Sequence, residues 1–419
     1  MAVQPIEVKK GKQMNQVHQI LIVGGGAAGI ATAASLQKRN RSLDIAIIEP
    51  ADKHYYQPGW TMVGAGIFNK EETCRDMTAV WPRGVKRIKG AVATFEPEKN
   101  SVTLLDGTIV EYTTLVVAAG LKLDWDAVEG LSDSLGSHGV TSNYRYDLAP
   151  YTWKLVQEMK GKEAIFTQPP MPIKCAGAPQ KAMYLSCDYW LKKSQLKDIN
   201  VSFCNAGPVL FGCAPYVPPL MEYIKKYGIN LDFGQNLVEI DGSKKIAWFK
   251  ISKEGSEPEV IERKFDMIHV CPPQCAPDFI KSSPISNEAG WVDVHQATLQ
   301  HTKYPNIFGL GDATSTPNAK TVAAARKQAP IVAANIIAQL AGKEPQPKYD
   351  GYGSCPLTVE KGKIILAEFG YGGKVMPTFP WDSTKPRRLA WFLKKSILPT
   401  VYWSLMLKGR EWLTKSSGV

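Results

Sequence analysis

The sequence predicts an α/β protein with two domains of the strand–helix–strand type, the second inserted into the first. Three observations support this. A short apolar run, a helical pattern and a second apolar run occur twice, at residues 19–48 and 164–204. Another buried strand and an alanine-rich helix follow at residues 304–340, and 419 residues are too many for one core. We place the first domain at residues 17–135 and 288–345, the second at 145–287, and a C-terminal region at 346–419.

The first strand–helix segment carries a glycine-rich turn. After the apolar run, Gly24, Gly26 and Gly29 stand in the spacing G-x-G-x-x-G before a helix that begins at Ala27 and Ala28. The first glycine permits a tight turn, the second lets backbone approach a pyrophosphate, and the third permits close helix–strand packing. The free N–H groups of the helix N-terminus then favour phosphate. This pattern is typical of a Rossmann-like domain.

A second strand, residues 45–48, ends at Glu49, about twenty residues past the last glycine as the motif requires. A carboxylate there accepts hydrogen bonds from a ribose 2′-hydroxyl and repels a 2′-phosphate. The segment therefore predicts an ADP-containing dinucleotide, with a plain strand–turn–helix as the alternative. Which dinucleotide it binds stays open at this point.

The net charge of +11 and the pI near 9.1 suit nucleic acid, an anionic membrane surface or an anionic substrate. No zinc-finger spacing or RNA-binding signature occurs, and the basic residues gather toward the C-terminus, so a membrane is the first expectation. The first sixteen residues lack an apolar stretch and arginine, which argues against a secretory signal and a mitochondrial transit peptide. No run of eighteen apolar residues predicts a spanning helix.

Between these segments the pattern changes several times. Residues 53–66 form an aromatic, glycine-rich stretch that we expect to be a loop covering a ligand. Strands are expected within 88–105, at 115–120, 164–167, 200–204 and 267–270, and as a hairpin at 245–251 and 257–263. Helices are expected at 149–159, up to 193, at 215–227 and at 321–340.

Two buried strands end where further cofactor contacts would lie. Ala119 and Gly120 let a backbone approach closely, and Asp312 can hold ribityl hydroxyls unless it is only a turn or capping residue. The helix that begins near Lys320 and Thr321 directs its positive end toward the same region. With the glycine turn, these features resemble the two-dinucleotide-binding-domain flavoproteins, the superfamily of glutathione reductase and type II NADH dehydrogenase. The resemblance implies FAD.

The second strand–helix loop argues against a nicotinamide site. Residues 169–179 contain one glycine and several prolines, which lack an N–H and cannot cradle a pyrophosphate. The other candidate loop, residues 204–213, also lacks the glycine spacing. Electrons are therefore not expected to come from NAD(P)H.

Cys175 lies in this same second loop, where the sequence predicts no nicotinamide site. It follows a lysine near the start of a helix containing Lys181, and both features lower a thiol pKa. A lone cysteine is more often structural, but Cys355 lies in an exposed-looking loop of the tail, and neither sits in an apolar periodic segment, unlike Cys187 and Cys204. Two such cysteines near a flavin suggest a redox-active disulfide.

The sequence here resembles the sulfide:quinone oxidoreductase family, on residues 174–181, 350–356 and 54–60 and on Gly311-Asp312 with Lys320-Thr321. The resemblance implies that hydrogen sulfide attacks a Cys175–Cys355 disulfide or a sulfur-bridged form of it, and that Cys355 becomes a persulfide. Cys175 would face the flavin, electrons would pass through FAD to ubiquinone or another quinone, and sulfite, glutathione or a second sulfide would take the sulfur. Lys181 and Lys394 would supply positive charge, with solvated surface lysines as the alternative.

Some members of the family that this sequence resembles bind FAD covalently through a cysteine upstream of the one that matches Cys175. This sequence has no cysteine between Cys74 and Cys175, so the resemblance implies a non-covalent cofactor. The residues expected to hold it are Gly24, Gly26, Ala27, Ala28, Gly29, Glu49, Gln57, Val92, Ala119, Gly120, Asp312, Lys320 and Thr321. An NADH:quinone oxidoreductase-type flavoprotein and a flavin scaffold that binds nucleic acid are the alternatives. The paired cysteines favour the enzyme and no nucleic acid partner.

The tail suggests a membrane contact. Residues 385–415 contain two apolar helical pieces broken at Pro399, interleaved with tryptophans and flanked by cations. We expect an amphipathic helical membrane-docking region that rests on lipid without spanning it; a helix packed on the protein's own core is the alternative. The protein would then be a peripheral (monotopic) protein of a bacterial or mitochondrial inner membrane, with a homodimer as a candidate assembly.

Overall fold

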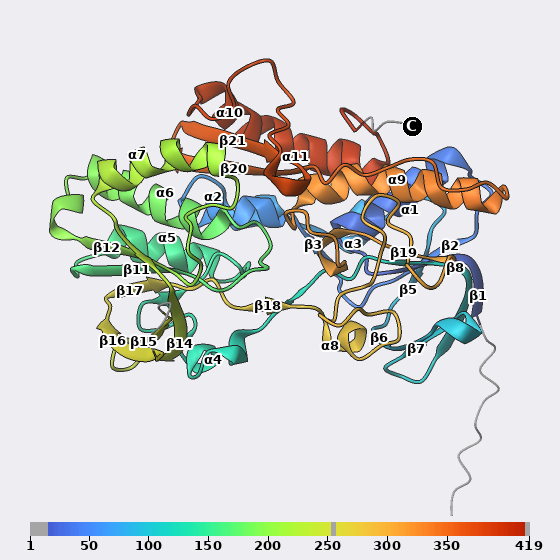
Figure 1. Ribbon diagram of the computed structural model, residues 1–419, viewed down its shortest axis with the longest axis horizontal. Helices are drawn as coiled ribbons and strands as arrows, with labels where there is room; N and C mark the ends of the chain where they lie inside the picture. The colour runs from blue at the N-terminus through green and yellow to red at the C-terminus, as the bar shows by residue number, and fades with distance from the viewer. Residues whose placement is uncertain (1–15, 253–256, 415–419) are drawn as a thin grey trace, which may run out of the picture.

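Apolar runs build the first sheet around β1 (Gln16–Val23), whose residues 20–23 are buried. The computed structural model describes residues 16–252 and 257–414 (Figure 1). Strand β1 lies between two parallel neighbours, a central position that favours apolar residues on both faces. The order is β5-β2-β1-β8-β7-β6, with β19 paired in parallel to β8. The other strands are β2 (Ile45–Ile48), β5 (Lys86–Ile88), β6 (Val92–Glu96), β7 (Ser101–Leu104), β8 (Ile109–Val117) and β19 (Ile307–Gly309).

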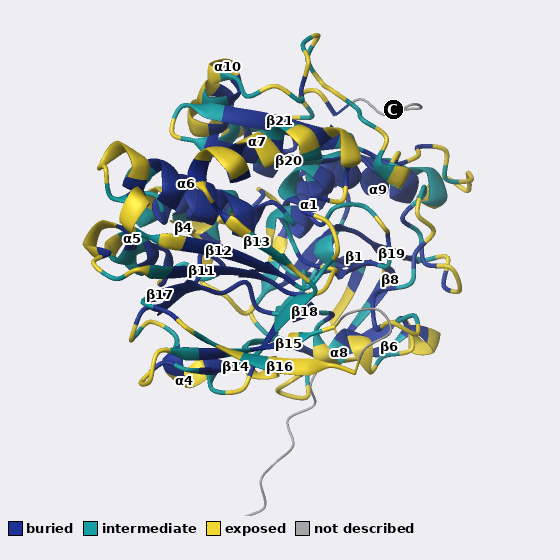
Figure 2. Cartoon of the chain, turned by 60° about the vertical axis from the view of Figure 1, so that its left-hand side comes forward, coloured by how far each residue is buried: buried dark blue, intermediate teal, exposed yellow. Residues whose placement is uncertain are grey.

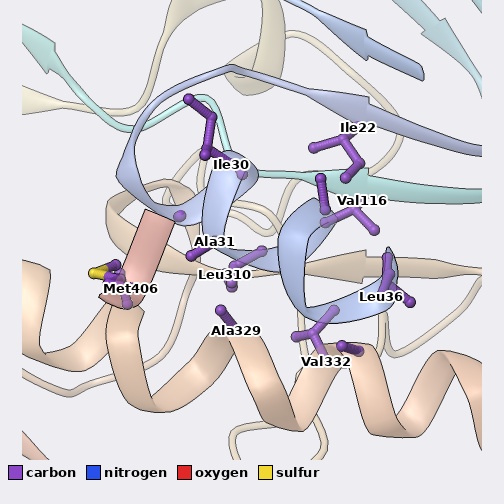
Figure 3. Close-up of a cluster of buried hydrophobic side chains, with 14 of the residues drawn as sticks. Ile22, Ile30, Ala31, Leu36, Val116, Leu310, Ala329, Val332 and Met406 are labelled. Atoms are coloured by element: carbon purple, nitrogen blue, oxygen red, sulfur yellow. The ribbon is translucent and has the colours of Figure 1, made fainter. Parts of the chain in front are cut away.

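Helices α1 (Ala27–Arg39) and α9 (Val322–Leu340) pack together against this sheet. Figure 3 shows the shared core, where Ile22 and Val116 of the sheet meet Ile30 and Leu36 of α1 and Val332 of α9. The first sheet and its core therefore combine segments from both ends of the chain.

The second sheet is parallel throughout, in the order β10-β17-β11-β12-β13. It occupies the left half of Figure 1, and its strands β11 and β12 are almost wholly buried in Figure 2. A two-stranded ribbon of β9 (Lys122–Leu123) and β18 (Gln274–Cys275) pairs the two connections between the halves. The sheet's strands are β10 (Val140–Thr141), β11 (Glu163–Gln168), β12 (Asn200–Asn205), β13 (Asn230–Phe233) and β17 (Met267–His269), and its helices are α5 (Ala149–Glu158), α6 (Ala178–Lys192) and α7 (Val217–Tyr227). An antiparallel sheet follows, of β14 (Gln235–Asp241), β15 (Ile246–Ile251) and β16 (Glu259–Lys264).

Short elements connect these layers. They are β3 (Lys53–Tyr55), α2 (Trp60–Val63), β4 (Cys74–Asp76), α3 (Met77–Val80), α4 (Leu131–Ser134) and α8 (Asp278–Lys281). The stretch 53–66, predicted to be a loop, thus contains a strand and a helical turn, because its aromatic side chains pack inward. The other predicted strands and helices are present within a few residues of their expected bounds.

The hairpin β20 (Gly353–Glu360) and β21 (Lys363–Phe369) contacts α6 on one side and α9 on the other (Figure 1). Here the prediction that Cys355 lies in an exposed loop is wrong, because the residue belongs to β20 and is fully buried. The strand brings it beneath the N-terminal end of α6.

The tail also departs from expectation. Its helical turns follow one another without interruption, so the predicted break at Pro399 is wrong. They are α10 (Arg388–Phe392), a π-helical turn (Leu393–Ile397), α11 (Leu398–Thr400), a second π-helical turn (Val401–Leu405) and a 3₁₀ turn (Met406–Lys408). Wider π turns on both sides of the proline absorb its missing N–H. Met406 lies in the first core beside Ala31 (Figure 3), so much of the tail packs on the protein itself.

Among the described residues, no helix combines the length and the apolar composition needed to cross a bilayer. The predictions about a signal or transit peptide concern residues that lie almost entirely outside the described ones.

Candidate active site

The glycine turn has the geometry that its spacing predicts. Gly24 has φ +103°, and a Cβ there would lie 2.6 Å from the Ala118 carbonyl oxygen. A Cβ on Gly29 would lie 1.9 Å from the Gly24 carbonyl oxygen, so any side chain would push α1 off the strand. Gly26, by contrast, has open space around its Cβ position, as backbone approached by a ligand requires.

Glu49 lies directly beside this turn. Its Oε2 accepts a hydrogen bond from the Gly25 N–H at 2.7 Å, and its Oε1 accepts one from the Ala51 N–H at 2.7 Å. The carboxylate is therefore fixed at the end of β2 with lone pairs to spare for a ribose hydroxyl. Ala27 and Ala28 begin α1 above it, and no side chain caps that helix.

The proline-rich loop after β11 meets the first sheet's half of the molecule at Cys175. The Cys175 N–H donates to the Lys320 carbonyl at 2.9 Å, and Lys174 and Lys320 form a parallel bridge. Cys175 itself has φ +51°, a left-handed conformation that non-glycine residues rarely adopt outside special sites. Its carbonyl accepts the Ala178 N–H at 2.7 Å, which starts the first turn of α6.

Gly177 allows Cys355 to approach this loop. A Cβ on Gly177 would lie 2.3 Å from Cδ2 of Leu357 and 3.7 Å from the Cβ of Cys355. The lone glycine of the loop therefore serves close packing of β20 under α6. Both cysteines are free thiols here, and their sulfurs share a hydrogen bond.

The two thiols are electrostatically unequal. The hydrogen bond from Cys355, together with the charges of Lys181 and Lys394, holds the pKa of Cys175 well below its ordinary value although burial opposes this. The same hydrogen bond, with burial, raises the pKa of Cys355 well above its ordinary value. Lys181 Nζ donates to Cys175 Sγ at 3.1 Å. Cys175 is therefore the thiolate of the pair.

Lys181 and Lys394 are not solvated surface lysines, because their exposed fractions are only 3% and 4%. The first π-helical turn carries Lys394 into the interior, where its Nζ lies 3.4 Å from the Pro58 carbonyl oxygen. Burial, and then the charge of Lys181, lowers the pKa of Lys394 to about 7. The site thus contains an amine that can change charge near neutral pH.

One cavity joins these groups. Lys174, Cys175, Lys181, Asp312 and Lys320 line its inner part, and the hairpin and tail line its outer part. Five cations (Lys174, Lys181, Lys320, Arg326 and Lys394) and two carboxyl groups (Asp312 and Glu368) face it, so the cavity favours small anions.

The predicted residues after β19 also reach this cavity. Asp312 lies in a 3₁₀ turn, where burial raises its pKa while Lys320 and Lys174 oppose the shift. Lys320 Nζ donates to the carbonyl oxygens of Asp312 and Thr314, at 3.0 and 2.8 Å, and burial lowers its pKa to about 8. Thr321 is the N-cap of α9, as its Oγ1 accepts the Ala324 N–H at 3.2 Å.

The remaining predicted cofactor residues are Gln57, Val92, Ala119 and Gly120, and their surroundings differ. Gln57 lines the cavity, and its Oε1 accepts a hydrogen bond from Lys174 Nζ at 2.7 Å. Ala119 and Gly120 follow β8, and Gly120 has φ +74° with open space at its Cβ position. The side chain of Val92 is buried in the core of the first sheet, which leaves only its backbone for a ligand.

Three buried side chains on the cavity wall have polar atoms without a hydrogen-bond partner among the described residues. They are the Trp60 Nε1–H, the Thr61 hydroxyl and the Asn143 amide. Buried polar groups are nearly always paired, so these atoms indicate a polar ligand. Together with the glycine cradle and Glu49 they fit a flavin dinucleotide.

Sequence reasoning missed several of these residues. Tyr144 lies buried on the cavity wall, and its hydroxyl donates to the Lys174 carbonyl at 3.2 Å. Trp291 lies under Lys320 Nζ at 4.1 Å from the ring centroid. Neither belongs to a recognisable motif. Gly177 could have been predicted, because a glycine among prolines, next to a candidate thiol, indicates that another segment packs closely against the loop.

The chain is similar to known proteins over nearly its full length. Residues 18–165 match the family model described as pyridine nucleotide-disulphide oxidoreductase. The mitochondrial sulfide:quinone oxidoreductase of Dictyostelium discoideum is 44% identical over 413 residues, which cover 98% of this chain and 90% of that protein. The mitochondrial sulfide:quinone oxidoreductase of Mus musculus is 39% identical, with coverage of 94% and 87%. The chain belongs to the sulfide:quinone oxidoreductase family.

A solved sulfide:quinone oxidoreductase from Aquifex aeolicus has the same fold, with a TM-score of 0.75, 19% identity and coverage of 94% of this chain and 92% of that one. Membership in the sulfide:quinone oxidoreductase family confirms the predicted resemblance and FAD as the cofactor. The NADH:quinone oxidoreductase alternative has less support from these relatives and from the proline-filled second loop.

Proposed function

We propose that this protein is an FAD-dependent sulfide:quinone oxidoreductase whose sulfur chemistry takes place at Cys175 and Cys355. The observation that carries the proposal is the unequal thiol pair, in which Lys181 lies 3.1 Å from Cys175 Sγ at the wall of a cationic cavity. The relatives that share 36–44% identity with this chain carry the same activity in their names.

In the oxidised enzyme the two cysteines form a disulfide. Hydrosulfide attacks Cys355 Sγ, a new S–S bond forms there, and the bond to Cys175 breaks with its electron pair left on Cys175. This direction is favoured because the thiol with the lower pKa is the better leaving group. Lys181 and Lys394 hold the resulting thiolate, and Cys355 carries the persulfide.

The persulfide then gives up its outer sulfur. A nucleophile such as sulfite, glutathione or a second sulfide attacks that sulfur, and Cys355 leaves with the electron pair and takes up a proton. The cysteine pair now holds two electrons more than the disulfide. Restoring the disulfide from the Cys175 thiolate and the Cys355 thiol releases two electrons and one proton, so a quinone that takes up the two electrons needs one further proton from solvent to become a quinol.

When bound, FAD supplies two-electron transfer between the thiol pair and the quinone. The residues that would hold it are the glycine turn, Glu49, Gln57, Asp312 and Thr321, with Trp60, Thr61 and Asn143 as donors and acceptors inside the cavity. The chain's own part is to keep Cys175 as a thiolate and to exclude bulk water from it. We propose that the FAD is bound without a covalent link.

The outer part of the cavity suits a quinone. Its wall is largely apolar there and comes from the hairpin and the tail, with Leu366, Phe379, Leu393, Leu398 and Val401. Lys394 stands between this region and the thiols, so a proton donor is at hand for a reduced quinone.

Membrane contact is proposed for the exposed side of the tail. Leu389, Phe392, Trp412 and Leu413 are large apolar residues with exposed fractions between 42% and 56%. They lie among cations and close to the outer cavity, as the entry of a lipid-soluble quinone requires. We place the protein at a mitochondrial inner membrane, because the close relatives are named mitochondrial, and we keep the domain bounds and a homodimer as proposals.

Anaerobic addition of sulfide to the yellow holoenzyme tests the proposal. We expect the flavin to bleach and a long-wavelength thiolate-to-flavin charge-transfer band to appear, both of which Cys175→Ser removes. Cys74→Ser is the matched control, because Cys74 lies outside the cavity, and it should keep both signals. Rapid bleaching by NADH, without bleaching by sulfide, would instead support the NADH-dependent alternative.

A further inference from the structure

A second cavity lies behind the tail and is strongly basic. Its charged lining residues are Lys38 and Arg41 at the end of α1, Arg83 after α3, and Lys408 and Arg410 of the tail. No aspartate or glutamate lines it. Three segments far apart in the sequence therefore bring five exposed cations to one concave site, a concentration of positive charge that suits an anionic ligand.

The cavity is a built feature of the fold, because the tail is fixed against α1. Gly409 has φ +67°, and a Cβ there would lie 2.6 Å from the Ala34 carbonyl oxygen. Arg39 and Glu411 form an ion pair, and the Ser35 hydroxyl donates to the same carboxylate at 2.6 Å. These contacts hold Lys408 and Arg410 on either side of the point where the tail touches α1.

The five cations lie beyond ion-pair distance of the carboxylates in the described chain. Lys38, Arg41, Arg83, Lys408 and Arg410 form no ion pair with any described residue. Glu411, which follows Arg410 in the tail, forms an ion pair with Arg39 and also feels the charge of Lys38. Burial, and then the neighbouring charges of Arg75 and Arg83, lowers the pKa of Lys408, which is the direction expected of a cation among cations.

The tail also separates this cavity from the one that contains the thiols. Met406, Trp412 and Leu413 line the thiol cavity, whereas Leu407, Lys408 and Arg410 line the basic one. The exposed apolar side chains of Trp412 and Leu413 therefore stand next to an anion site on the same short segment. Apolar anchors beside clustered cations are the surface chemistry of contact with an anionic membrane.

We propose that the basic cavity binds the phosphate of an anionic membrane phospholipid and thereby fixes the mouth of the thiol cavity at the lipid surface. The inference rests on the proposed quinone chemistry, which requires a membrane. The C-terminal end of α1 carries partial negative charge, so the phosphate is held by the side chains and depends on their number.

Vesicle binding of the full-length holoenzyme tests this. The pocket variant is Lys38→Gln, Arg41→Gln, Arg83→Gln, and the control is Lys162→Gln, Lys197→Gln, Lys250→Gln. The control loses the same charge from exposed lysines of the second-sheet half that form no ion pair with a described residue. Each cation at an anionic surface contributes about fivefold in binding, so the pocket variant should bind phosphatidylglycerol-containing vesicles roughly 100-fold more weakly.

The control should bind nearly as well as the original protein, and neither variant should differ from it on pure phosphatidylcholine. An equal loss in both variants would mean that only net charge matters and would overturn the proposal. Binding of inorganic phosphate to the original protein, without any loss of vesicle binding in the pocket variant, would assign the cavity to soluble anions. Stronger binding to duplex DNA than to vesicles would assign it to nucleic acid. Sulfide-driven bleaching, measured without vesicles, should be unchanged in both variants, so failure of the proposed function would be seen separately.

Discussion

Replacing Lys394 by methionine should make the protein more stable and the enzyme slower. Lys394 is buried beside Lys181, and burial lowers its pKa from 10.5 to about 7. A lysine with a lowered pKa prefers to be protonated in the unfolded chain. Its cost to folding is therefore full below pH 7, shrinks as the pH rises and disappears above pH 10.5.

The size of this effect follows from the two pKa values. They correspond to a cost of about 5 kcal/mol when the lysine is charged in both states. At pH 8 the cost is about 3 kcal/mol, and at pH 10 it is about 1 kcal/mol. Methionine keeps most of the side-chain volume, and the bond lost to the Pro58 carbonyl is a long one of 3.4 Å. Lys394→Met should thus gain about 3 kcal/mol at pH 8 and about 1 kcal/mol at pH 10.

Urea unfolding of the holoenzyme at both pH values, with the same FAD concentration, measures the gain. Lys395→Met is the matched control, because Lys395 itself is exposed and its replacement should change the free energy of unfolding little. Turnover with sulfide near pH 7, where Lys394 is partly charged, should fall in Lys394→Met, since the pKa of Cys175 depends on that charge. A loss of stability at pH 8, or an equal gain at pH 10, would refute the inference that burial lowers the pKa of Lys394.

Three further predictions concern the same site. Gly177→Val should cost about 1–3 kcal/mol by overpacking against Leu357 and should separate the thiols, so alkylation of Cys175 should require a higher pH; an unchanged alkylation profile would contradict this. Lys181→Met should also move that alkylation profile to higher pH, whereas Lys192→Met, on the same helix but paired with Asp188, should not. Denaturation by acid or heat should release all FAD into the supernatant, and flavin that stays with the precipitate would disprove non-covalent binding.

The glycine turn and Glu49 were predictable because their chemistry is local. The turn needs a positive φ at Gly24, the helix needs Gly29 to approach the strand, and the acidic residue stands a fixed distance along the chain. Each of these constraints requires one residue type at a fixed spacing, which can be recognised in the sequence. Cys175 was predicted for a similar reason. The prolines of its loop argue against a nicotinamide site, and the lysine beside it favours a reactive thiol.

Cys355 was found for a partly wrong reason. Glycines and a proline around it predicted an exposed loop, yet the residue is buried in β20. Strand β20 pairs only with β21 in the described chain, and a strand with a free edge tolerates Pro356. Gly353 is needed there because a Cβ would lie 3.1 Å from Ala319. Such close approaches depend on the tertiary packing, which spacing alone does not reveal.

The tail was predicted least well, since apolar and aromatic residues look alike whether they face lipid or core. Tyr402 and Trp403 are buried. The Tyr402 hydroxyl lies 2.6 Å from Nε2 of His54, although the two residues are far apart in the sequence. Trp412, by contrast, is exposed, although it lies in the same tail. The contacts of Tyr402 and Trp403 with His54 and Tyr56, which the sequence does not reveal, make these two side chains part of the core.

The proposed site combines residues from segments spread over most of the chain. Cys175 comes from a loop of the second sheet, Cys355 from the hairpin, Lys394 from the tail, and Asp312 and Lys320 from the first sheet's half. A thiolate in a buried site is unfavourable unless cations accompany it, and each cation that is brought in is unfavourable by itself, as the pKa of Lys394 near 7 demonstrates. Burial of the thiolate and of the cations is favourable only when they are close to one another, so the site forms only after these segments have packed. Partial folding would then leave an ordinary thiol at Cys175, which keeps the reactive sulfur from appearing before its cavity has closed around it.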